Sequence, residues 1–346
     1  MPLKSNIHNN KINRLIHELI GNTPLRKCGY LSSKINAGIY IKEEFHNPGM
    51  SSKDRPALYM IQDALLKNKI QTGGEFVEAS SGNTGLSITM IAKELGFKST
   101  IFVSQTCSNE KIAMLQNAGA RVEICENSNG LHDFYSTQFK AQSYASNHPN
   151  AYFTNQYYNS ANIKSHYLTT GPEIWAQTKG KITHFIAGVG TGGTISGIGR
   201  FLKEQNKGIK IWGVEPKGSI LSHFLKQGSL PKGDSTVEPI EGIGRTFVPG
   251  SFDGEYVDKI FQIGYQESAE QAVSYRKNAG MLTGFSSAAV LATLEKYHKE
   301  LAFEPTDVIV ILFPDHGSRY ISKLYEGKMN DTVYSKNFFN QKLANL

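Results

Sequence analysis

Residues 76–95, FVEASSGNTGLSITMIAKEL, join a short apolar run to an amphipathic segment through the small residues SSGNTG at positions 80–85. The apolar run predicts a strand over residues 76–79, and the spacing of Ile88 and Ile91 predicts a helix after it. At a helix start, free backbone N–H groups and the positive end of the helix dipole attract anions. An ordinary N-cap needs only one small polar residue or glycine. Six such residues in a row therefore predict an anion-binding loop.

Strand-like and helix-like segments alternate along most of the chain, and this alternation predicts an α/β fold. Apolar, β-branched runs bounded by turn residues predict further strands over residues 100–104, 121–126, 184–187, 210–214 and 308–313. Helical spacing predicts helices over residues 109–118 and 195–205. Strands that alternate with helices form parallel sheets covered on both faces, which bind ligands at the carboxyl ends of the strands.

A second strand–loop–helix junction is GVGTGGT at residues 188–194. Its glycines allow a ligand to approach the backbone closely, and its threonines add hydroxyl donors, as in phosphate-binding loops. The same letters fit the dinucleotide fingerprint G-x-G-x-x-G, and Glu215 follows the next predicted strand, where an acidic residue would bind a ribose. From this motif alone, a NAD-binding oxidoreductase and an enzyme that binds a single phosphate group are both open.

Lys53 distinguishes between these alternatives. It lies in NPGMSSKDRP, residues 47–56, where a turn-rich segment leads into a helix predicted to begin near Asp54. The positive end of that helix and the neighbouring Arg55 are expected to lower the pKa of the lysine. A lysine with a lowered pKa is suited to form a Schiff base. Without the other motifs, an ordinary surface lysine would be the better interpretation.

The composition limits the classes of function. Of the 346 residues, 39% are hydrophobic and 19% are charged, which is typical of a globular chain of two domains. The formal net charge of +7 comes from scattered basic residues, so anionic small molecules are expected as partners, not nucleic acid or a membrane surface. The N-terminal residues lack the apolar core of a signal peptide, and no stretch of about 18 apolar residues could span a membrane. A cytoplasmic location is therefore expected.

The cysteines and histidines suggest no metal site. The spacing of Cys28, Cys107 and Cys125 fits neither a disulfide framework nor a zinc site, so free and unreactive thiols are expected. The ten histidines form no metal-binding pattern. His316 is expected in a loop near the entrance of the active site.

Four motifs occur in the order NPGMSSKDR (residues 47–55), EASSGNTG (78–85), GVGTGGT (188–194) and TGFSSAAV (283–290). They resemble the fold-type II enzymes that depend on pyridoxal 5′-phosphate (PLP), and among these the cysteine synthase and cystathionine β-synthase family. The resemblance covers about residues 19–324. It implies an α/β fold of the tryptophan synthase β-like type, with two domains that each contain a mostly parallel sheet covered by helices.

The resemblance also implies how the chain is divided. Residues 13–45 and 161–326 are expected to form a larger domain that binds the PLP phosphate. Residues 46–160 are expected to form a smaller domain with the Schiff-base lysine and the loop for the substrate carboxylate. Residues 1–12 are expected to be a flexible segment and residues 327–346 a C-terminal tail. Because the family is mostly dimeric, a homodimer is expected.

The family's site residues carry over position by position. The resemblance implies that Lys53 holds PLP as a Schiff base and exchanges a proton with the substrate's α-carbon. It implies that Asn83 hydrogen-bonds the PLP 3′-hydroxyl and that Ser286 faces the pyridine nitrogen. The implied phosphate-binding residues are Gly190, Thr191, Gly192, Gly193 and Thr194. The implied substrate-binding residues are Ser80, Ser81, Gly82, Thr84, Gln156 and Gly242.

The implied reaction, that of a lyase or transferase, replaces the β-substituent of serine or an O-activated serine through an aminoacrylate intermediate. A serine at the ring nitrogen leaves PLP a weaker electron sink than an aspartate would, which suits elimination. PKGSIL at residues 216–221 and EGIG at residues 241–244 look more like cystathionine β-synthase, whose nucleophile is homocysteine. Cysteine synthesis from O-acetylserine and sulfide, and the use of an amine nucleophile, remain open.

The sequence departs from the family pattern beside the expected site. Met50 stands where a glycine is usual, and Ser52 where an apolar residue is usual. Phe285 replaces a small residue, and Ala79-Ser80 replaces a Pro-Thr or Gly-Thr pair. These differences bear on the choice of substrates and not on the cofactor.

Overall fold

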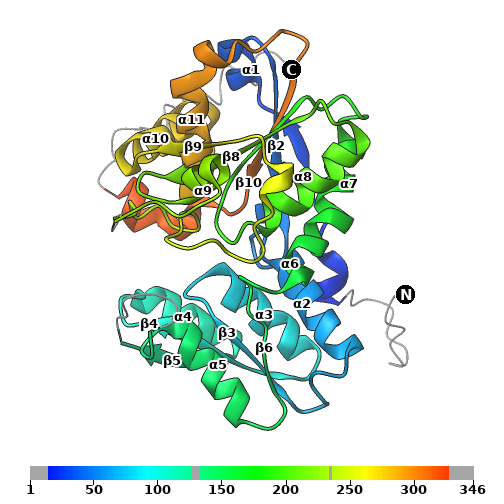
Figure 1. Ribbon diagram of the computed structural model, residues 1–346, viewed down its shortest axis with the longest axis vertical. Helices are drawn as coiled ribbons and strands as arrows, with labels where there is room; N and C mark the ends of the chain where they lie inside the picture. Colours follow the sequence, from blue (N-terminus) through cyan, green and yellow to red (C-terminus); the bar gives the residue numbers. More distant parts are fainter. Residues whose placement is uncertain (1–14, 127–132, 234–235, 327–346) are drawn as a thin grey trace, which may run out of the picture.

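The computed structural model describes residues 15–126, 133–233 and 236–326, whose strands form two separate sheets (Figure 1). The larger sheet has the strand order β1-β2-β10-β7-β8-β9. Its strands are β1 (Leu25–Lys27), β2 (Gly38–Glu43), β7 (His184–Gly188), β8 (Lys210–Pro216), β9 (Lys259–Ile263) and β10 (Val308–Phe313). Neighbouring strands are parallel except for β1, which pairs antiparallel with β2 at one edge.

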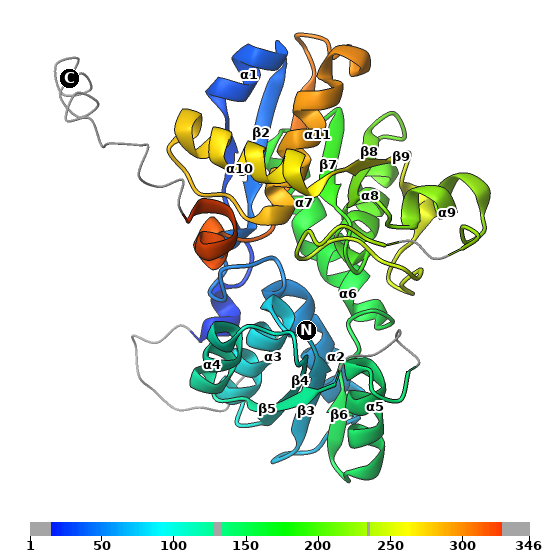
Figure 2. The same ribbon diagram turned by 90° about the vertical axis from the view of Figure 1, so that its left-hand side faces the viewer.

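The smaller sheet has the strand order β5-β4-β3-β6, and all of its pairs are parallel. Its strands are β3 (Glu75–Ala79), β4 (Lys98–Ser104), β5 (Arg121–Cys125) and β6 (Ala151–Phe153). Figure 2 shows the two sheets one above the other, each with its own helices. The predicted α/β fold with two mostly parallel sheets is therefore confirmed, whereas the residues at which the two domains divide remain a prediction.

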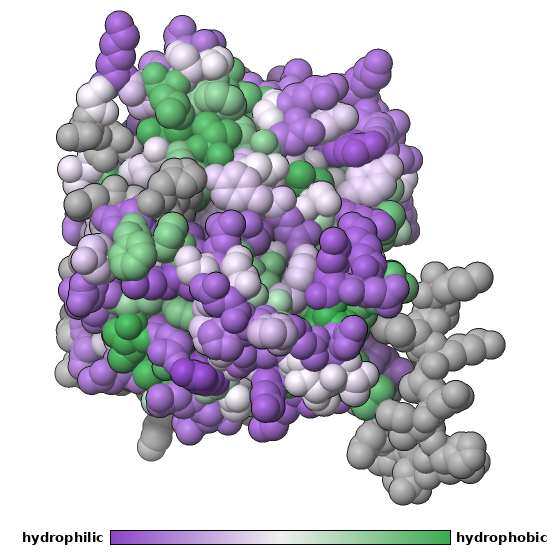
Figure 3. Space-filling model, turned by 60° about the horizontal axis from the view of Figure 1, so that its bottom comes forward, coloured by the Kyte–Doolittle hydropathy of each residue, from purple (hydrophilic) through white to green (hydrophobic). Residues whose placement is uncertain are grey.

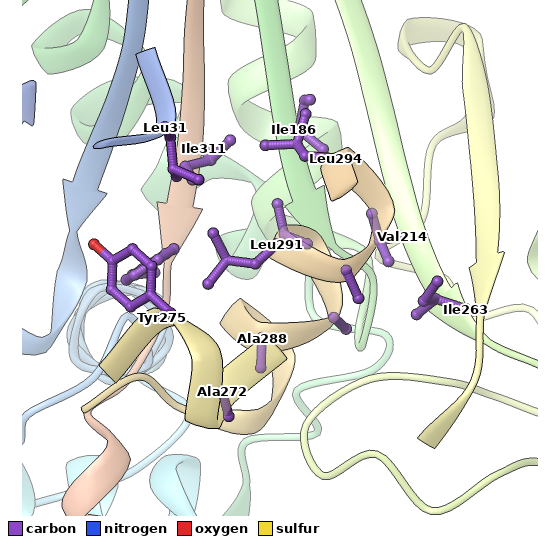
Figure 4. Packing of buried hydrophobic residues seen from close by; sticks show 14 of the residues in the cluster. Leu31, Ile186, Val214, Ile263, Ala272, Tyr275, Ala288, Leu291, Leu294 and Ile311 are labelled. Atoms are coloured by element: carbon purple, nitrogen blue, oxygen red, sulfur yellow. The ribbon is translucent and has the colours of Figure 1, made fainter. Parts of the chain in front are cut away.

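Helices cover both faces of the larger sheet. One face packs against α1 (Gly29–Ile35), α10 (Tyr265–Ala279) and α11 (Phe285–Leu301). Figure 4 shows Leu291 of α11 among strand residues that include Ile186 and Ile311. The other face packs against α7 (Gly171–Gln177), α8 (Gly193–Gln205) and α9 (Leu221–Gln227). Phe185 and Ile186 are adjacent in β7 but belong to opposite cores, which explains why a parallel strand is apolar at every position.

The smaller sheet is covered in the same way. On one face lie α2 (Asp54–Leu66), α3 (Asn83–Glu94) and α4 (Asn109–Ala118). On the other face lies α5 (Thr137–Asn147). The short helix α6 (Ser160–Ser165) packs against both α2 and α8, so it connects the two halves of the molecule (Figure 1).

The predicted elements are confirmed with small shifts of their ends. The helix over residues 109–118 and the strand over residues 308–313 agree to the residue. The helix predicted from residue 195 begins at Gly193, because the glycine-rich loop itself supplies its first turn. The predicted N-terminal segment (1–12) and C-terminal tail (327–346) lie outside the described residues.

Cys28, Cys107 and Cys125 are free, and burial raises the pKa of the Cys107 and Cys125 thiols. Within the described part of the chain, no helix has the length and apolar character that crossing a membrane requires. The face in Figure 3 is largely hydrophilic, with hydrophobic residues gathered in smaller areas.

Candidate active site

Residues that follow β3, β4 and β7 line one cavity of about 1010 Å³. This is the position at which parallel sheets present ligand sites. Of the predicted site residues, its wall contains Lys53, Ser80, Ser81, Gly82, Asn83, Thr84, Gln156, Thr191 and Gly242. The predicted residues that lie outside this wall are Gly190, Gly192, Gly193, Thr194 and Ser286.

Lys53 immediately precedes α2 and is half-buried in the cavity wall. Burial lowers the pKa of its amine, the Asp315 carboxylate raises it in part, and the charge of Arg245 lowers it again. The predicted direction of the pKa shift agrees with this, but Arg55, one of its two predicted causes, is not among the groups that shift it. The guanidinium of Arg55 is instead held by the carboxylates of Glu44 and Glu173.

The loop after β3 leads directly into α3. The Thr84 hydroxyl donates to Oε1 of Gln156 at 2.7 Å, which brings two predicted carboxylate-binding residues together. The backbone N–H of Ser81 has no acceptor in the described chain, and the Ser80 hydroxyl accepts from the N–H of Gly82 at 3.4 Å. Free donors at the start of a helix are suited to a carboxylate.

Two residues that the sequence analysis missed, Glu78 and Asn162, hold Gln156. The N–H and Nε2 of Gln156 donate to the Glu78 carboxylate at 3.2 and 3.4 Å, and Thr154 donates to it as well. Nδ2 of Asn162 donates to the Gln156 carbonyl at 2.8 Å and to the Thr191 hydroxyl at 3.0 Å. Hydrogen bonds therefore connect the loop after β3 with the loop after β7. Burial raises the pKa of Glu78 to about 7.

The loop after β7 offers three consecutive backbone N–H groups, those of Gly190, Thr191 and Gly192, that have no acceptor within the described chain. The helix α8 begins immediately afterwards, so the positive end of its dipole lies at the same place. Gly192 has φ +88°, and a Cβ on it would lie 2.6 Å from the Cα of Phe252, so only glycine fits there. These unpaired donors fit a phosphate group.

Asn83 is oriented by a further residue that the sequence analysis missed, Asp315. Nδ2 of Asn83 and the Tyr320 hydroxyl both donate to Oδ2 of Asp315, at 2.8 and 2.6 Å. Burial raises the pKa of this carboxyl group. Asp315 follows β10 at the carboxyl edge of the larger sheet, a position that could have marked it in the sequence. The neighbouring His316 bonds to Ser318 and is not part of the cavity wall.

Ser286 lies in the first turn of α11 and is 4% exposed. Among the described residues, no hydrogen-bond partner is found for its hydroxyl. A Cβ built on Gly188 would lie 3.6 Å from the Cβ of Ser286, so the serine is close to the loop after β7. A hydroxyl on a largely buried residue that has no protein partner fits the nitrogen of a pyridine ring, which accepts a hydrogen bond.

Comparison with known proteins agrees with this geometry. The chain matches the family described as "Pyridoxal-phosphate dependent enzyme" over residues 16–315. The chain belongs to this family of PLP-dependent enzymes. Its cofactor is pyridoxal phosphate, and the free donors after β7, the Ser286 hydroxyl and the amine of Lys53 fit the phosphate, ring nitrogen and aldehyde of that group.

Proteins of similar sequence indicate which members of this family the chain resembles. The chain is 38% identical to a cystathionine beta-synthase of Apis mellifera over 94% of its own length, and spans 66% of that protein. It is 37% identical to an O-acetylserine dependent cystathionine beta-synthase of Bacillus subtilis (strain 168), covering 90% of this chain and 97% of the relative. It is 34% identical to a cysteine synthase of Dictyostelium discoideum, covering 99% and 92%.

A solved structure extends the comparison. A crystal structure of O-ureido-L-serine synthase superposes with a TM-score of 0.81 at 26% identity, covering 96% of this chain and all of that one. Together with the relatives, it makes the chain a PLP-dependent β-replacement enzyme of the cystathionine β-synthase and cysteine synthase family.

Glu215, which had kept a nicotinamide cofactor open, has a structural role in this PLP enzyme. Its buried carboxylate accepts from the Ser219 hydroxyl at 2.6 Å and from the backbone N–H groups of Leu221 and Ser222 at 3.0 and 2.9 Å. It therefore binds the N-terminus of α9. A carboxylate engaged in this way is not free to bind a ribose.

Two glycines of the EGIG segment differ in their surroundings. Gly242 lines the cavity, and a Cβ on it would meet nothing within 4 Å. A Cβ on Gly244 would lie 2.7 Å from the Pro216 side chain, so packing requires that glycine. Met50, where the family has glycine, also lines the cavity and has φ +55°, a conformation that favours glycine.

Proposed function

We propose that the enzyme forms cystathionine from homocysteine and serine or an O-activated serine. The observation that carries the proposal is the size of the whole cavity, about 1010 Å³, which has to hold PLP, the first amino acid and the nucleophile together. Sulfide needs no such space, whereas a second amino acid does. Gly242 adds open room at the wall. Cysteine synthesis from O-acetylserine and sulfide is the nearest alternative.

The roles of the protein groups follow from their positions. PLP supplies an electron sink that stabilises negative charge at the α-carbon of the bound amino acid. Lys53 would hold PLP, and its amine would take the α-proton of the bound amino acid and return it after the nucleophile has added. Its lowered pKa favours the neutral amine that this exchange requires.

The α-carboxylate of the substrate is expected to orient the amino acid by binding to the loop after β3. The free N–H of Ser81 and the hydroxyl group of Ser80, which accepts a hydrogen bond but donates none within the described chain, provide donors for that group. Gln156 lies beside Thr84 and is held in place by Glu78. A carboxylate fixed in this way places the α-proton of the amino acid toward Lys53.

The test is a matrix of substrates with the PLP-loaded enzyme. Serine, O-acetylserine and O-phosphoserine are each combined with sulfide, homocysteine and a panel of amines, and products are identified by mass spectrometry. The largest kcat/KM is expected with homocysteine. Turnover of O-acetylserine with sulfide and none with homocysteine would make the enzyme a cysteine synthase. Turnover only with an amine would exclude both thiol reactions.

A further inference from the structure

Arg245 places a guanidinium in the cavity wall without a carboxylate partner within 4 Å in the described chain. Its Nη1 donates to the carbonyl of Gly244, while its Nε is buried and has no hydrogen-bond partner. The carbon of the guanidinium lies 5.1 Å from the centre of the Tyr157 ring, which restricts its position. A buried donor of this kind is normally satisfied, so the unpaired nitrogen indicates a missing acceptor.

The guanidinium lies close to the reacting centre. It lines the same cavity as the amine of Lys53, and its charge lowers the pKa of that amine. Its Nη2 lies 3.4 Å from the position that a Cβ on Gly190 would occupy, so it also lies beside the loop after β7. The loop expected to hold the α-carboxylate, residues 80–84, follows β3 of the smaller sheet, whereas Arg245 lies beside the loop that follows β7 of the larger sheet. Arg245 is therefore not part of the loop expected to bind the α-carboxylate.

The other basic residues of the wall, Lys53 apart, are held by the protein. Lys111 and Lys323 both form ion pairs with Glu241 at the mouth of the cavity. Arg319 has a buried, unpaired Nε as well, but both of its terminal nitrogens are engaged: Nη2 donates to the carbonyl of Gly49 at 2.6 Å and Nη1 to the sulfur of Met114 at 3.4 Å. Arg245 is thus the arginine of the described wall that keeps a terminal nitrogen, Nη2, as well as Nε for a ligand.

We propose that Arg245 binds an anionic group of the reactants other than the α-carboxylate of the first amino acid. Two groups have this chemistry: the phosphate of O-phosphoserine, and the carboxylate of an incoming amino acid such as homocysteine. A planar guanidinium binds either with paired, charge-assisted hydrogen bonds. Such a subsite would select among the substrates of the proposed β-replacement, so the inference rests on that proposed function.

Two pairs of reactions distinguish the sources of the anion. O-phosphoserine and O-acetylserine are compared with sulfide as the common nucleophile, and homocysteine and sulfide are compared with O-acetylserine as the common first substrate. Arg245→Gln is expected to lower kcat/KM either for O-phosphoserine relative to O-acetylserine or for homocysteine relative to sulfide, in each case by about 10- to 100-fold. Arg245→Lys should restore part of that ratio. Arg200→Gln, which removes an exposed arginine of α8, should leave both ratios unchanged.

Other outcomes overturn the inference. An equal loss in all reactions would give Arg245 a structural role, and weaker PLP binding in an absorbance titration would place it at the cofactor phosphate. If the wild-type enzyme catalyses none of the reactions, the proposed function fails separately, and binding still tests the subsite. O-phosphoserine or homocysteine should then raise the melting temperature of the PLP-loaded wild type more than that of Arg245→Gln, and equal shifts refute the subsite.

Discussion

Replacing Glu44 with glutamine is expected to destabilise the protein by about 3 kcal/mol at neutral pH. Glu44 belongs to a buried cluster of two basic and two acidic side chains, with Lys42, Arg55 and Glu173. Arg55 donates to Glu44 at 2.7 and 2.8 Å and to Glu173 at 2.6 and 2.8 Å, and Lys42 donates to Glu173 at 2.7 Å. The charges balance, so the loss of one leaves an uncompensated charge away from water.

The magnitude follows from the pKa of Glu44. Burial alone would raise it, but Arg55 and Lys42 hold it at about 2, against an ordinary value of 4.5. Because a shift of one pKa unit corresponds to about 1.36 kcal/mol, the ionised carboxylate stabilises the fold by about 3 kcal/mol. Breaking a buried ion pair by removing one partner costs about 3–5 kcal/mol, which agrees. The contribution is present above pH 4.5 and is lost as the pH falls toward 2.

Urea unfolding followed by circular dichroism measures the effect. Glu295→Gln is the matched control, because Glu295 pairs with Lys34 at the surface, where both side chains are more than a third exposed. Its expected cost is below about 1 kcal/mol. Adding Lys42→Met to Glu44→Gln restores the balance of charge, so the double variant should lose less than the sum of the single losses.

Two results would refute the reasoning about Glu44. The first is a loss in Glu44→Gln no larger than that in Glu295→Gln. The second is a difference between wild type and Glu44→Gln that stays constant as the pH is lowered below 4.5, since protonation of Glu44 should abolish the advantage of the wild type.

Three further predictions concern the cofactor and the assembly. Lys53→Ala should lose both turnover and the visible absorbance band of lysine-bound PLP; retention of both would remove the central role of Lys53. Gly192→Asp should lose PLP by steric conflict and charge repulsion, whereas Gly228→Asp, at another positive φ but with open space for a Cβ, should keep it. We also expect a homodimer, and light scattering that reports a monomer across micromolar concentrations would contradict this.

The secondary structure was accessible from the sequence because it depends on local patterns. Helical and alternating spacings of apolar residues, with turn residues between them, gave α4 and β10 to the residue. Glycine and small polar residues at the starts of α3 and α8 marked the two loops that we predict to bind anions. Both loops were predictable because backbone geometry at a helix start depends on neighbours in the chain.

The surroundings of the site residues were not accessible in this way. Asp315 and Asn83 are separated by 232 positions in the chain, yet their side chains share a hydrogen bond. Asn162 connects Gln156 with Thr191 through hydrogen bonds that the spacing of these residues in the sequence does not predict. Such contacts require both sheets to be formed and placed against one another.

The amino-acid sequence by itself determined the alternation of strands and helices, the two loops at helix starts and the position of Lys53, the lysine proposed to hold PLP, since each is encoded in a continuous segment. Only the tertiary structure decided which charges surround that lysine. The sequence placed Arg55 beside Lys53, but the fold turns Arg55 into a buried ion cluster and brings Arg245 near Lys53. Electrostatic effects depend on distance in space and on exclusion of water, and both arise only when distant segments pack together.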